Sequence, residues 1–517
     1  MTTLLAIIAV AFMSSVVATL VMRTVAHRVG LTDRPDAHRK MQSKPVALGG
    51  GVAVFVGLLV ALAMVAATPN HFRGQFLAGA GNLCWLLVAG MVIVLVGLLD
   101  DRCNLRGRHK LLGQIAAALI LVPAGFAIHH VRIFDTNIEL GLLSVPFTLF
   151  WLLGAVNALN LIDGADGLAS SVGIILCLAI SGMCLLTRHP VEGIVAWAFA
   201  GSLLGFLCFN FPPARIYLGD AGSMLIGLLV GALAIRASLK GPATVALAAP
   251  LAIWAIPIFD VSAAIVRRKL TGRSVYTTDR GHLHHRLLAM TGNNTLVLGV
   301  VAAACVITCL GATLSLHFNN DLLAFAAVAP VAGIFVVTRA FGDVELLLVA
   351  NRVKSLGQSM LNPVSGRSEA TVEAAVRLQG DRPWDELWAS LTEFADKLRL
   401  YSIRLDVNLP AVREDFHASW RRPSRCDPQE LWRTEIPLFL KTNVIGRLVV
   451  AGKRDDGPSC QYIERLMDLL EPFETQLVEM AAANTRPVEL ETAELDLLRL
   501  SDTERLPALG NTSKGGV

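Results

Sequence analysis

Two adjacent aspartates, Asp100 and Asp101, lie in the segment VGLLDDRCNLRGRHK, directly after an apolar run long enough to lie in a lipid bilayer. Neighbouring carboxylates repel each other, and burial makes the ionised form of either one costly. Four basic residues follow within ten positions, and Lys110 is the last of them. We therefore expect a positive partner beside this pair. Lys110 could neutralise a substrate phosphate, or it could only anchor its helix at a membrane interface.

Three further aspartates stand at similar places in the sequence. Asp163 and Asp166 lie in NALNLIDGADGL, and Asp220 lies in YLGDAGS. If all five carboxylates share one site, each raises the pKa of the others. A hard divalent cation would relieve this repulsion, because Mg²⁺ binds a few carboxylates together with substrate phosphates. The alternative for any single aspartate is that it caps a helix, as Asp220 could do at the start of an apolar run.

Two asparagines precede the first of these acidic motifs. Asn157 and Asn160 are three residues apart and therefore share one face of a helix. Gly164 and Gly167 follow, and they give the turn the freedom to bring its backbone close to a ligand. The pattern indicates a ligand site, although a simple helix end and turn would also explain it.

A histidine cluster occurs later, in DRGHLHHRL. His282, His284 and His285 stand there between Arg280 and Arg286. Such a cluster can bind phosphate, for which arginine is the better bidentate partner. The alternative is that it only adds to the positive charge of a cytoplasmic loop. A zinc site is disfavoured, because no cysteine is near.

One ionisable residue, Asp260, lies inside an apolar run about two turns before Arg267. A charged group in a membrane segment indicates a functional site. Pairing with Arg267 or Arg268 is the structural alternative.

The apolar segments must position these residues. The chain has 517 residues, 54% of them hydrophobic, and its mean hydropathy is +0.57. Runs of about 20 residues, the length that crosses a hydrocarbon core, recur before about residue 341. We expect about eleven membrane helices, at 3–26, 48–67, 80–99, 111–128, 143–160, 168–187, 191–209, 218–235, 244–266, 296–315 and 322–339.

Charge sets the expected orientation. The loops on one side of these helices hold 16 Lys and Arg residues, and those on the other side hold 5. The richer side is expected to be cytoplasmic, which places the N-terminus in the periplasm. All the polar clusters above then lie on the cytoplasmic face. A transporter would more often place its polar residues near the middle of the bilayer, so we favour an enzyme over a transporter or a non-catalytic scaffold.

Together, LLDDRCNLRGRHKLL, NALNLIDGADGLA, LGDAGSMLIG and GHLHHRL resemble the motifs of the polyprenyl-phosphate N-acetylhexosamine-1-phosphate transferases. DRPDAHRKMQSKPVALGGGVA resembles their first cytoplasmic loop, and the resemblance covers about residues 1–340. It implies an all-α polytopic enzyme of the bacterial inner membrane. Such an enzyme uses Mg²⁺ or Mn²⁺ to transfer a phospho-sugar from a UDP-sugar to undecaprenyl phosphate, with release of UMP.

The resemblance also implies roles for single residues. Asp100, Asp101 and Lys110 would be catalytic, with Asp100 favoured as a base toward the lipid phosphate. Asn160 and Asp220 would be metal ligands. The residues expected to bind the nucleotide, the diphosphate and the sugar are Lys44, Asn157, Asp163, Asp166, Arg280, His282, His284 and His285. Direct attack and a covalent aspartyl intermediate both stay open.

HLHHRL resembles the branch that starts O-antigen, enterobacterial common antigen and teichoic acid linkage units. The peptidoglycan branch usually has three consecutive histidines, which this sequence lacks. We therefore expect UDP-GlcNAc or a related UDP-HexNAc as the donor. Phospho-MurNAc-pentapeptide transfer is the alternative. No nucleic-acid partner is expected, and a homodimer stays open.

The rest of the chain has a different character. Residues 1–341 carry a net charge of +10 and residues 342–517 carry −6. We expect a transmembrane domain at 1–341, a cytoplasmic α+β domain at 342–484 and a disordered tail at 485–517. Within residues 342–484, the pattern of apolar residues predicts helices at 383–398 and 462–482, with strands at 401–409, 431–440 and 444–453 between them. The order resembles a GAF-like sensor domain, to which a regulatory partner could bind.

Overall fold

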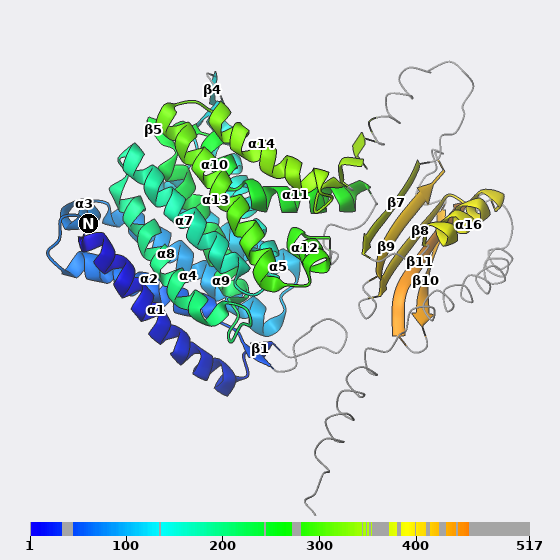
Figure 1. Ribbon diagram of the computed structural model, residues 1–517, viewed down its shortest axis with the longest axis horizontal. Coiled ribbons are helices and arrows are strands. Elements are labelled where there is room, and N and C mark those ends of the chain that lie inside the picture. Colours follow the sequence, from blue (N-terminus) through cyan, green and yellow to red (C-terminus); the bar gives the residue numbers. More distant parts are fainter. Residues whose placement is uncertain are drawn as a thin grey trace, which may run out of the picture. The chain divides into compact units, whose positions relative to one another are not determined.

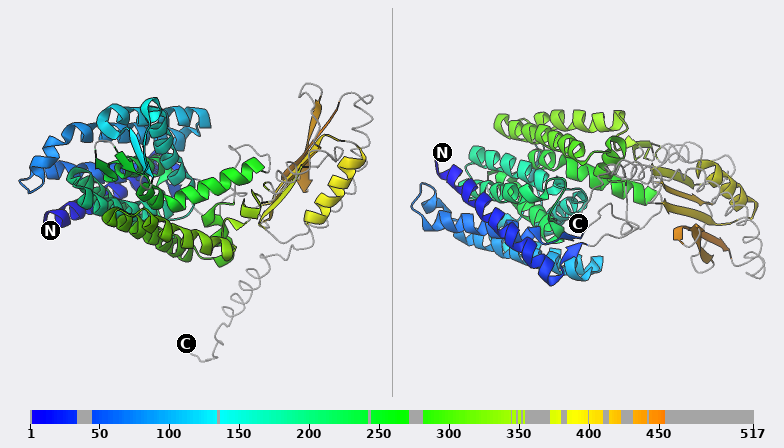
Figure 2. Two further views of the ribbon diagram at one scale, coloured as in Figure 1. Left: turned by 90° about the horizontal axis from the view of Figure 1, so that it is seen from above. Right: turned by 60° about the horizontal axis from the view of Figure 1, so that its bottom comes forward.

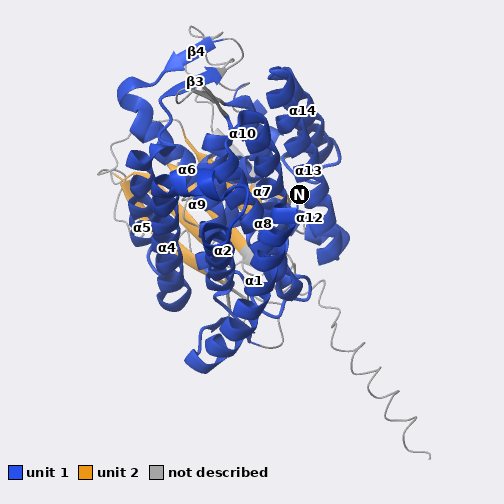
Figure 3. Cartoon of the chain, turned by 90° about the vertical axis from the view of Figure 1, so that its left-hand side faces the viewer, with its two compact units in different colours: residues 1–366 blue, residues 367–517 orange. Residues whose placement is uncertain are grey.

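The computed structural model divides the chain into two compact units, residues 1–366 (unit 1) and 367–517 (unit 2) (Figure 3). The predicted domain boundary at residue 341 lies inside unit 1. The structure describes residues 2–33, 45–133, 136–241, 244–270, 281–343, 345–347, 349–350, 353, 372–379, 384–398, 400–409, 414–422, 431–440 and 443–453.

Unit 1 is mostly helical (Figure 1). Within the described residues, nine helices are long and apolar enough to cross a membrane. They are α1 (Thr2–Val29), α2 (Gly50–Ala67), α4 (Ala80–Cys103), α5 (Gly107–Leu121), α6 (Ser144–Ile162), α7 (Leu168–Thr187), α8 (Pro190–Asn210), α9 (Gly219–Ala237) and α13 (Asn294–Phe318). The candidate span of α5 continues through the turn that follows it to Phe126, and that of α6 includes the turn before it and starts at Gly141. These nine coincide with nine of the eleven predicted spans.

The other two predicted spans correspond to shorter helices. The last one is α14, Leu322–Val337, with 16 residues. The span expected over 244–266 is wrong as a single helix, because the chain forms α10 (Ala248–Ile253) and α11 (Ala255–Leu270). Pro257 has no N–H for the carbonyl of Ile253, and its ring crowds that carbonyl, which favours the break between α10 and α11. By length and composition, the described residues therefore support nine spans rather than eleven.

Short elements connect the long helices. They are α3 (Arg73–Ala78), α12 (Leu283–Thr291), the π-helical turn Val122–Phe126 and the 3-10 turn Gly141–Leu143. Strands β3 (His130–Ile133), β4 (Thr136–Glu139), β5 (Leu239–Gly241) and β6 (Thr244–Ala246) form a sheet in the order β4-β3-β6-β5. Strands β1 (Thr32–Asp33) and β2 (Val46–Ala47) form an antiparallel pair.

Helix α9 is the centre of unit 1. Of its membrane-span window, 89% is buried, against 22% for α1, which runs along the outside of the bundle (Figure 2). Helix α9 packs against α2, α4, α6, α7 and α8. Asp220 lies in its first turn, and the helix ends just before β5. Its 19 residues span about 28 Å, so Asp220 and the four-stranded sheet lie at opposite ends of the bundle.

Glycine allows α4 to approach α9 closely. A Cβ atom on Gly97 would lie 2.7 Å from the carbonyl carbon of Asp220 and closer still to the backbone of Ala221. Gly97 is one turn before Asp100, so this contact determines how far Asp100 lies from Asp220.

The described residues of unit 2 form an antiparallel sheet with one helix packed on it. Its strands are β7 (Val372–Gln379), β8 (Ser402–Leu409), β9 (Glu414–Arg421), β10 (Leu431–Leu440) and β11 (Asn443–Lys453), in the order β10-β11-β8-β9-β7. Helix α16 (Trp384–Lys397) supplies Trp384, Trp388 and Leu391 to the core, where they join the alternating buried residues Ile403, Leu405 and Val407 of β8.

The predicted helix at 383–398 and the three predicted strands are confirmed, whereas the sequence analysis missed β7 and β9. The predicted helix at 462–482 and the predicted tail at 485–517 lie outside the described residues. The GAF-like arrangement stays a prediction.

We expect the Gly97→Ala variant to lower the midpoint of thermal unfolding in detergent. The added methyl group would push α4 away from α9, and overpacking of this kind costs about 1–3 kcal/mol. The control is Gly299→Ala in α13, where a Cβ would meet no atom within 4 Å. Equal midpoints for the two variants would show that α4 and α9 are not closely packed at Gly97.

Candidate active site at one end of the helix bundle

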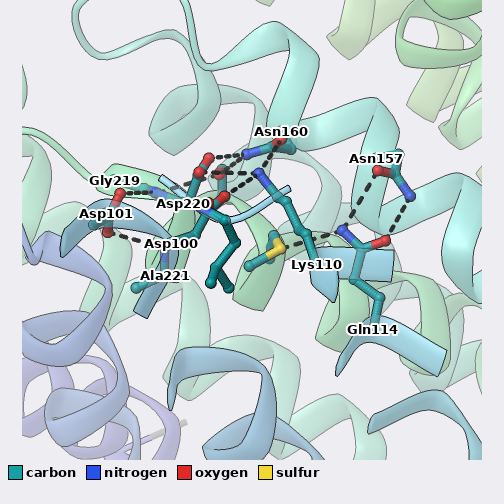
Figure 4. Close-up of polar contacts among 12 residues, drawn as sticks. Asp100, Asp101, Lys110, Gln114, Asn157, Asn160, Gly219, Asp220 and Ala221 are labelled. Atoms are coloured by element: carbon teal, nitrogen blue, oxygen red, sulfur yellow. Dashed lines mark hydrogen bonds and ion pairs between the residues drawn. The ribbon is translucent and has the colours of Figure 1, made fainter. Parts of the chain in front are cut away.

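The ammonium group of Lys110 lies among oxygens from three other helices (Figure 4). It is 2.9 Å from Asp100 Oδ2, 2.9 Å from Asp220 Oδ2 and 3.1 Å from Asn160 Oδ1. We call Asp100, Lys110, Asn160 and Asp220 the lysine cluster. They come from α4, α5, α6 and α9. Three sequence motifs that were predicted to share a site therefore meet at one atom.

Asp100 also ends its own helix. Asn104 follows α4 in the left-handed conformation, with φ of 48°, and its N–H donates to the Asp100 carbonyl. The N–H of Leu105 donates to Asp100 Oδ1 at 2.8 Å. One carboxylate oxygen therefore holds the turn after α4, and the other faces Lys110. This arrangement orients the carboxylate without any ligand.

Asp101 turns its carboxylate in a different direction from Asp100. It accepts the backbone N–H of Asp220 at 2.9 Å and that of Ala221 at 3.4 Å. Gly219 has a φ of +72°, and a side chain there would collide with this carboxylate. Asp101 thus caps the first turn of α9, where the N–H groups have no partner within the helix. The geometry gives Asp101 a positioning role at α9, and its predicted catalytic role stays a prediction.

The two asparagines of α6 have different partners. Asn160 Nδ2 donates to Asp220 Oδ1 at 2.5 Å and to Ser223 Oγ at 2.9 Å. Asn157 instead forms a reciprocal amide pair with Gln114 of α5, with distances of 2.9 and 3.4 Å. This pair fixes the register of α5 against α6. Asn157 therefore supports the lysine cluster from one turn away.

Gln114 and Ser223 are site residues that the sequence analysis did not single out. Gln114 is buried and follows Lys110 by one helical turn. A lone amide in an otherwise apolar run, spaced to share the face of Lys110, was the signal for Gln114. Ser223 is likewise buried, and it lies one residue after the GDAG of its motif.

Asp163 and Asp166 lie in the turn between α6 and α7. Burial is the largest cause that raises the pKa of Asp163 well above its usual range, followed by the negative charges of Asp220, Asp101 and Asp166. Asp166 Oδ2 accepts the N–H of Ala214 at 2.9 Å and so holds the loop that leads to α9. Asp163 is therefore the carboxyl of this turn that faces the other acidic groups.

The histidine cluster reaches the same acidic turn. The ring of His284 packs against Gly164, where an added Cβ would collide with it. His284 is buried, and neither ring nitrogen has a hydrogen-bond partner among the described residues. Burial first, and then His285 and His282, lower the pKa of His284 well below its usual value. His284 is therefore uncharged here, so this ring does not add the positive charge that the sequence pattern suggested for the cluster.

Within the described part of the chain, Asp260 pairs with His282 and not with the arginines considered from the sequence. It is buried and accepts from His282 Nδ1 at 3.1 Å and from the N–H of Leu283 at 2.8 Å. Arg267 forms a buried ion pair with Glu345 instead. The predicted site residues Lys44 and Arg280 lie outside the described residues.

The lysine cluster has the donor chemistry of a cation site, because carboxylate and amide oxygens converge on one positive group. Within the part of the chain that the structure describes, no group of three or more His, Cys, Asp or Glu side chains is arranged to hold a metal ion by itself. The carboxylate and amide oxygens of the lysine cluster are of the type that Mg²⁺ binds, but they do not form a complete set of ligands. An ion here would need further ligands from substrate phosphates, as Mg²⁺ commonly does.

Comparison with known proteins decides the family. A model of glycosyl transferase family 4 matches residues 83–238. The probable undecaprenyl-phosphate N-acetylglucosaminyl 1-phosphate transferase of Bacillus subtilis (strain 168) is 32% identical over 282 residues, which cover 54% of this chain and 76% of that protein. The chain belongs to the polyprenyl-phosphate N-acetylhexosamine-1-phosphate transferases.

Two other proteins of this transferase family are similar over a comparable length. The decaprenyl-phosphate N-acetylglucosaminephosphotransferase of Mycobacterium tuberculosis (strain CDC 1551 / Oshkosh) is 36% identical over 327 residues, covering 58% of this chain and 80% of that protein. The undecaprenyl-phosphate alpha-N-acetylglucosaminyl 1-phosphate transferase of Yersinia pestis is 30% identical over 305 residues, covering 57% and 80%. Membership of the family implies a polyprenyl-phosphate acceptor and a nucleotide-sugar donor. The residues matched to the family model include the whole lysine cluster.

The raised pKa of Asp163 has a consequence for stability. Between the usual pKa of 3.8 and its raised value, the folded transferase keeps a proton that the unfolded chain has lost. The free energy of unfolding therefore falls as the pH rises through this range. We expect the thermal midpoint, measured in detergent without divalent ions, to fall as the pH rises above 3.8 toward the raised pKa of Asp163.

The Asp163→Asn variant should reduce this fall, because an amide does not titrate. Glu139→Gln, which removes an exposed carboxylate on β4, should keep the wild-type fall. If Asp163→Asn shows the same pH dependence as the wild type, Asp163 is not the source of the effect.

Proposed function

We propose that this protein transfers N-acetylglucosamine-1-phosphate from UDP-GlcNAc to undecaprenyl phosphate and releases UMP. The lysine cluster is the observation that carries the proposal. It gathers a cation, two carboxylates and an amide at one end of a bundle of apolar helices. A site at this end can meet a lipid-borne phosphate and a water-soluble nucleotide sugar together.

The reaction requires charge neutralisation more than covalent chemistry. An oxygen of the lipid phosphate forms a bond to the β-phosphorus of the UDP-sugar. The bond from this phosphorus to the bridging oxygen breaks, and the oxygen leaves with the electron pair as part of UMP. A phosphate monoester has a second pKa near 6, so the attacking oxygen carries little proton at neutral pH.

The residues of the lysine cluster have distinct tasks in this proposal. Lys110 places its ammonium against the phosphates, where it offsets the charge that two anionic substrates bring together. Asp100, oriented by the turn after α4, holds Lys110 and accepts any proton that remains on the lipid phosphate. Asp101 keeps the start of α9 in place. Direct attack is favoured over a covalent intermediate, because Asp100 already accepts hydrogen bonds from two groups.

A divalent ion, Mg²⁺ or Mn²⁺, would neutralise the diphosphate and act as a Lewis acid when bound. Asp220 and Asn160 of the lysine cluster would hold it, with Asp163 as a further carboxylate. The charge surplus supports this assignment, because the pKa of Asp163 is raised by other carboxylates around it. Release of a proton from Asp163 would then favour the bound ion.

The donor sugar is inferred from two observations. All three relatives described above are named for N-acetylglucosamine, and HLHHRL lacks the three consecutive histidines typical of the peptidoglycan branch. Phospho-MurNAc-pentapeptide transfer is the alternative. The product would start a cell-envelope glycan such as O-antigen or another lipopolysaccharide or wall polymer.

The location follows from charge and chemistry. The loops with 16 Lys and Arg residues would face the cytoplasm, where nucleotide sugars occur. We place the chain in the bacterial inner membrane with its N-terminus in the periplasm, and with both the lysine cluster and unit 2 on the cytoplasmic side. A transporter is disfavoured, because the cluster lies at helix ends rather than at mid-helix.

The residues that carry the proposed transfer reaction all lie in unit 1, so unit 2 needs another role. Its sheet and α16 form a separate core, and we propose that it regulates the transferase by binding a protein or small-molecule partner.

The first test is a transfer assay with purified protein, undecaprenyl phosphate, Mg²⁺ and radiolabelled UDP-GlcNAc. We expect lipid-linked product and UMP from the wild type. Lys110→Met should lower kcat/KM by about 100-fold or more, because a preorganised donor to a phosphate is lost. Asp220→Ala should have an effect of the same size.

The matched control is Arg108→Met, which removes an exposed cation of the same helix and should keep activity within about twofold of the wild type. Product from a UDP-MurNAc-pentapeptide but not from UDP-GlcNAc would support the alternative donor. Failure to form product from any UDP-HexNAc would overturn the proposed function.

The second test removes unit 2. A chain that ends at residue 366 keeps all of unit 1, so it should retain its transfer activity in detergent. Inside cells, we expect its glycan output to differ from that of the full chain at equal protein level. Unchanged output and unchanged complex formation would exclude the regulatory role.

A further inference from the structure

Asp260 connects the membrane helices to the histidine cluster. It lies in the middle of α11 and is fully buried. One of its carboxylate oxygens is 3.1 Å from His282 Nδ1, and the other accepts the N–H of Leu283 at 2.8 Å. Both oxygens of one carboxylate are thus used at a single point, the start of α12.

These two contacts serve different purposes. Leu283 is the first residue of α12, and its N–H has no partner within the helix. The N-cap residue is His282, whose own side chain does not cap the helix. Asp260 caps α12 in its place, so the imidazole of His282 is not needed to satisfy the N–H groups at the start of the helix. Because a carboxylate accepts, His282 Nδ1 carries a hydrogen, and the distal nitrogen Nε2 faces away from Asp260.

The rings that follow lead toward the acidic turn. The rings of His282 and His284 are parallel within 9°, with centroids 6.1 Å apart. His284 in turn contacts Gly164, the neighbour of Asp163. Asp260 therefore anchors a row of imidazoles that ends at the α6–α7 turn.

Helix α12 has a second attachment that does not involve histidine. Arg286 pairs with Asp343 at 2.8 Å and donates to the Arg339 carbonyl at 3.0 Å. This attachment holds α12 to the segment after α14. It offers a means to loosen α12 without disturbing His282.

We propose that Asp260 is a positioning residue for donor binding, which sets the tautomer and the place of His282 so that Nε2 can meet the diphosphate of the UDP-sugar. The proposal rests on the proposed function, since the diphosphate belongs to its donor. Asp260 itself does not touch the substrate. A carboxylate that orients a histidine in this way is a common second partner of functional imidazoles.

The test is a double-mutant cycle read in the transfer assay. Asp260→Asn and His282→Ala should each lower kcat/KM for UDP-GlcNAc by about 10- to 100-fold, the usual effect of losing such an orienting carboxylate. The loss should appear mainly in KM for UDP-GlcNAc, with KM for undecaprenyl phosphate unchanged. The double variant should be no more than about twofold worse than His282→Ala, because both changes remove the same interaction.

Asp343→Asn is the matched control, because it replaces another carboxylate that anchors α12. It should keep kcat/KM within about threefold, and its effect should multiply with that of His282→Ala. If Asp260→Asn also multiplies with His282→Ala, Asp260 only anchors the helix and the proposal is overturned.

His282→Asn covers the case in which Asp260→Asn does not fold. Its side-chain amide can still donate to Asp260, but it lacks the distal nitrogen, so the variant should fold and yet show a raised KM for UDP-GlcNAc. A wild-type KM would overturn the proposal.

A thermal-shift titration with UDP-GlcNAc separates this proposal from the proposed function, because it requires no turnover. We expect the nucleotide sugar to raise the midpoint of the wild type and of Asp343→Asn, but not that of Asp260→Asn or His282→Asn. Lack of transfer by the wild type contradicts the proposed function. Transfer by the wild type with equal midpoint rises in all four proteins contradicts the positioning role alone.

Discussion

The ammonium group of Lys110 is surrounded by oxygens from α4, α6 and α9, and the arrangement of these helices depends on this contact. Asp100 and Asp220 would repel each other across the end of an apolar bundle if no cation lay between them. Burial strengthens both the repulsion and its relief, because water screens these charges poorly there. If the ammonium of Lys110 turned to a substrate phosphate, Asp100 and Asp220 would need another cation, which fits the divalent ion proposed above.

Helix α9 carries this constraint through the fold. It is the most buried of the candidate spans, and its first turn is fixed by Asp101 from α4. Gly97 lets the two helices approach until this contact forms. The adjacent aspartates that looked repulsive in the sequence thus divide two tasks, since Asp100 faces the cation and Asp101 faces backbone N–H groups. Helix geometry makes this division possible, because consecutive side chains of an α-helix point about 100° apart around its axis.

The histidine cluster differs from the lysine cluster, because burial and a single carboxylate hold it in place rather than a central cation. Asp260 uses both carboxylate oxygens to start α12 and to hold His282. His284 then packs, uncharged, against the glycine of the acidic turn. Burial rather than positive charge governs this ring. The sequence suggested positive charge at this cluster, because residue types report the charge that a group can carry and not whether the fold leaves it in water.

The sequence by itself determined nine of the membrane helices, the carboxylate and histidine motifs, and α16 and three strands of unit 2. Length, hydropathy and period are local properties, so these predictions needed no contacts between distant residues. Tertiary structure alone decided that Gln114 pairs with Asn157 and that β7 and β9 complete the sheet. It also decided that Asp101 caps the start of α9 and that Asp260 pairs with His282. Each of these depends on which helices or strands become neighbours, and packing between residues far apart in the chain sets that.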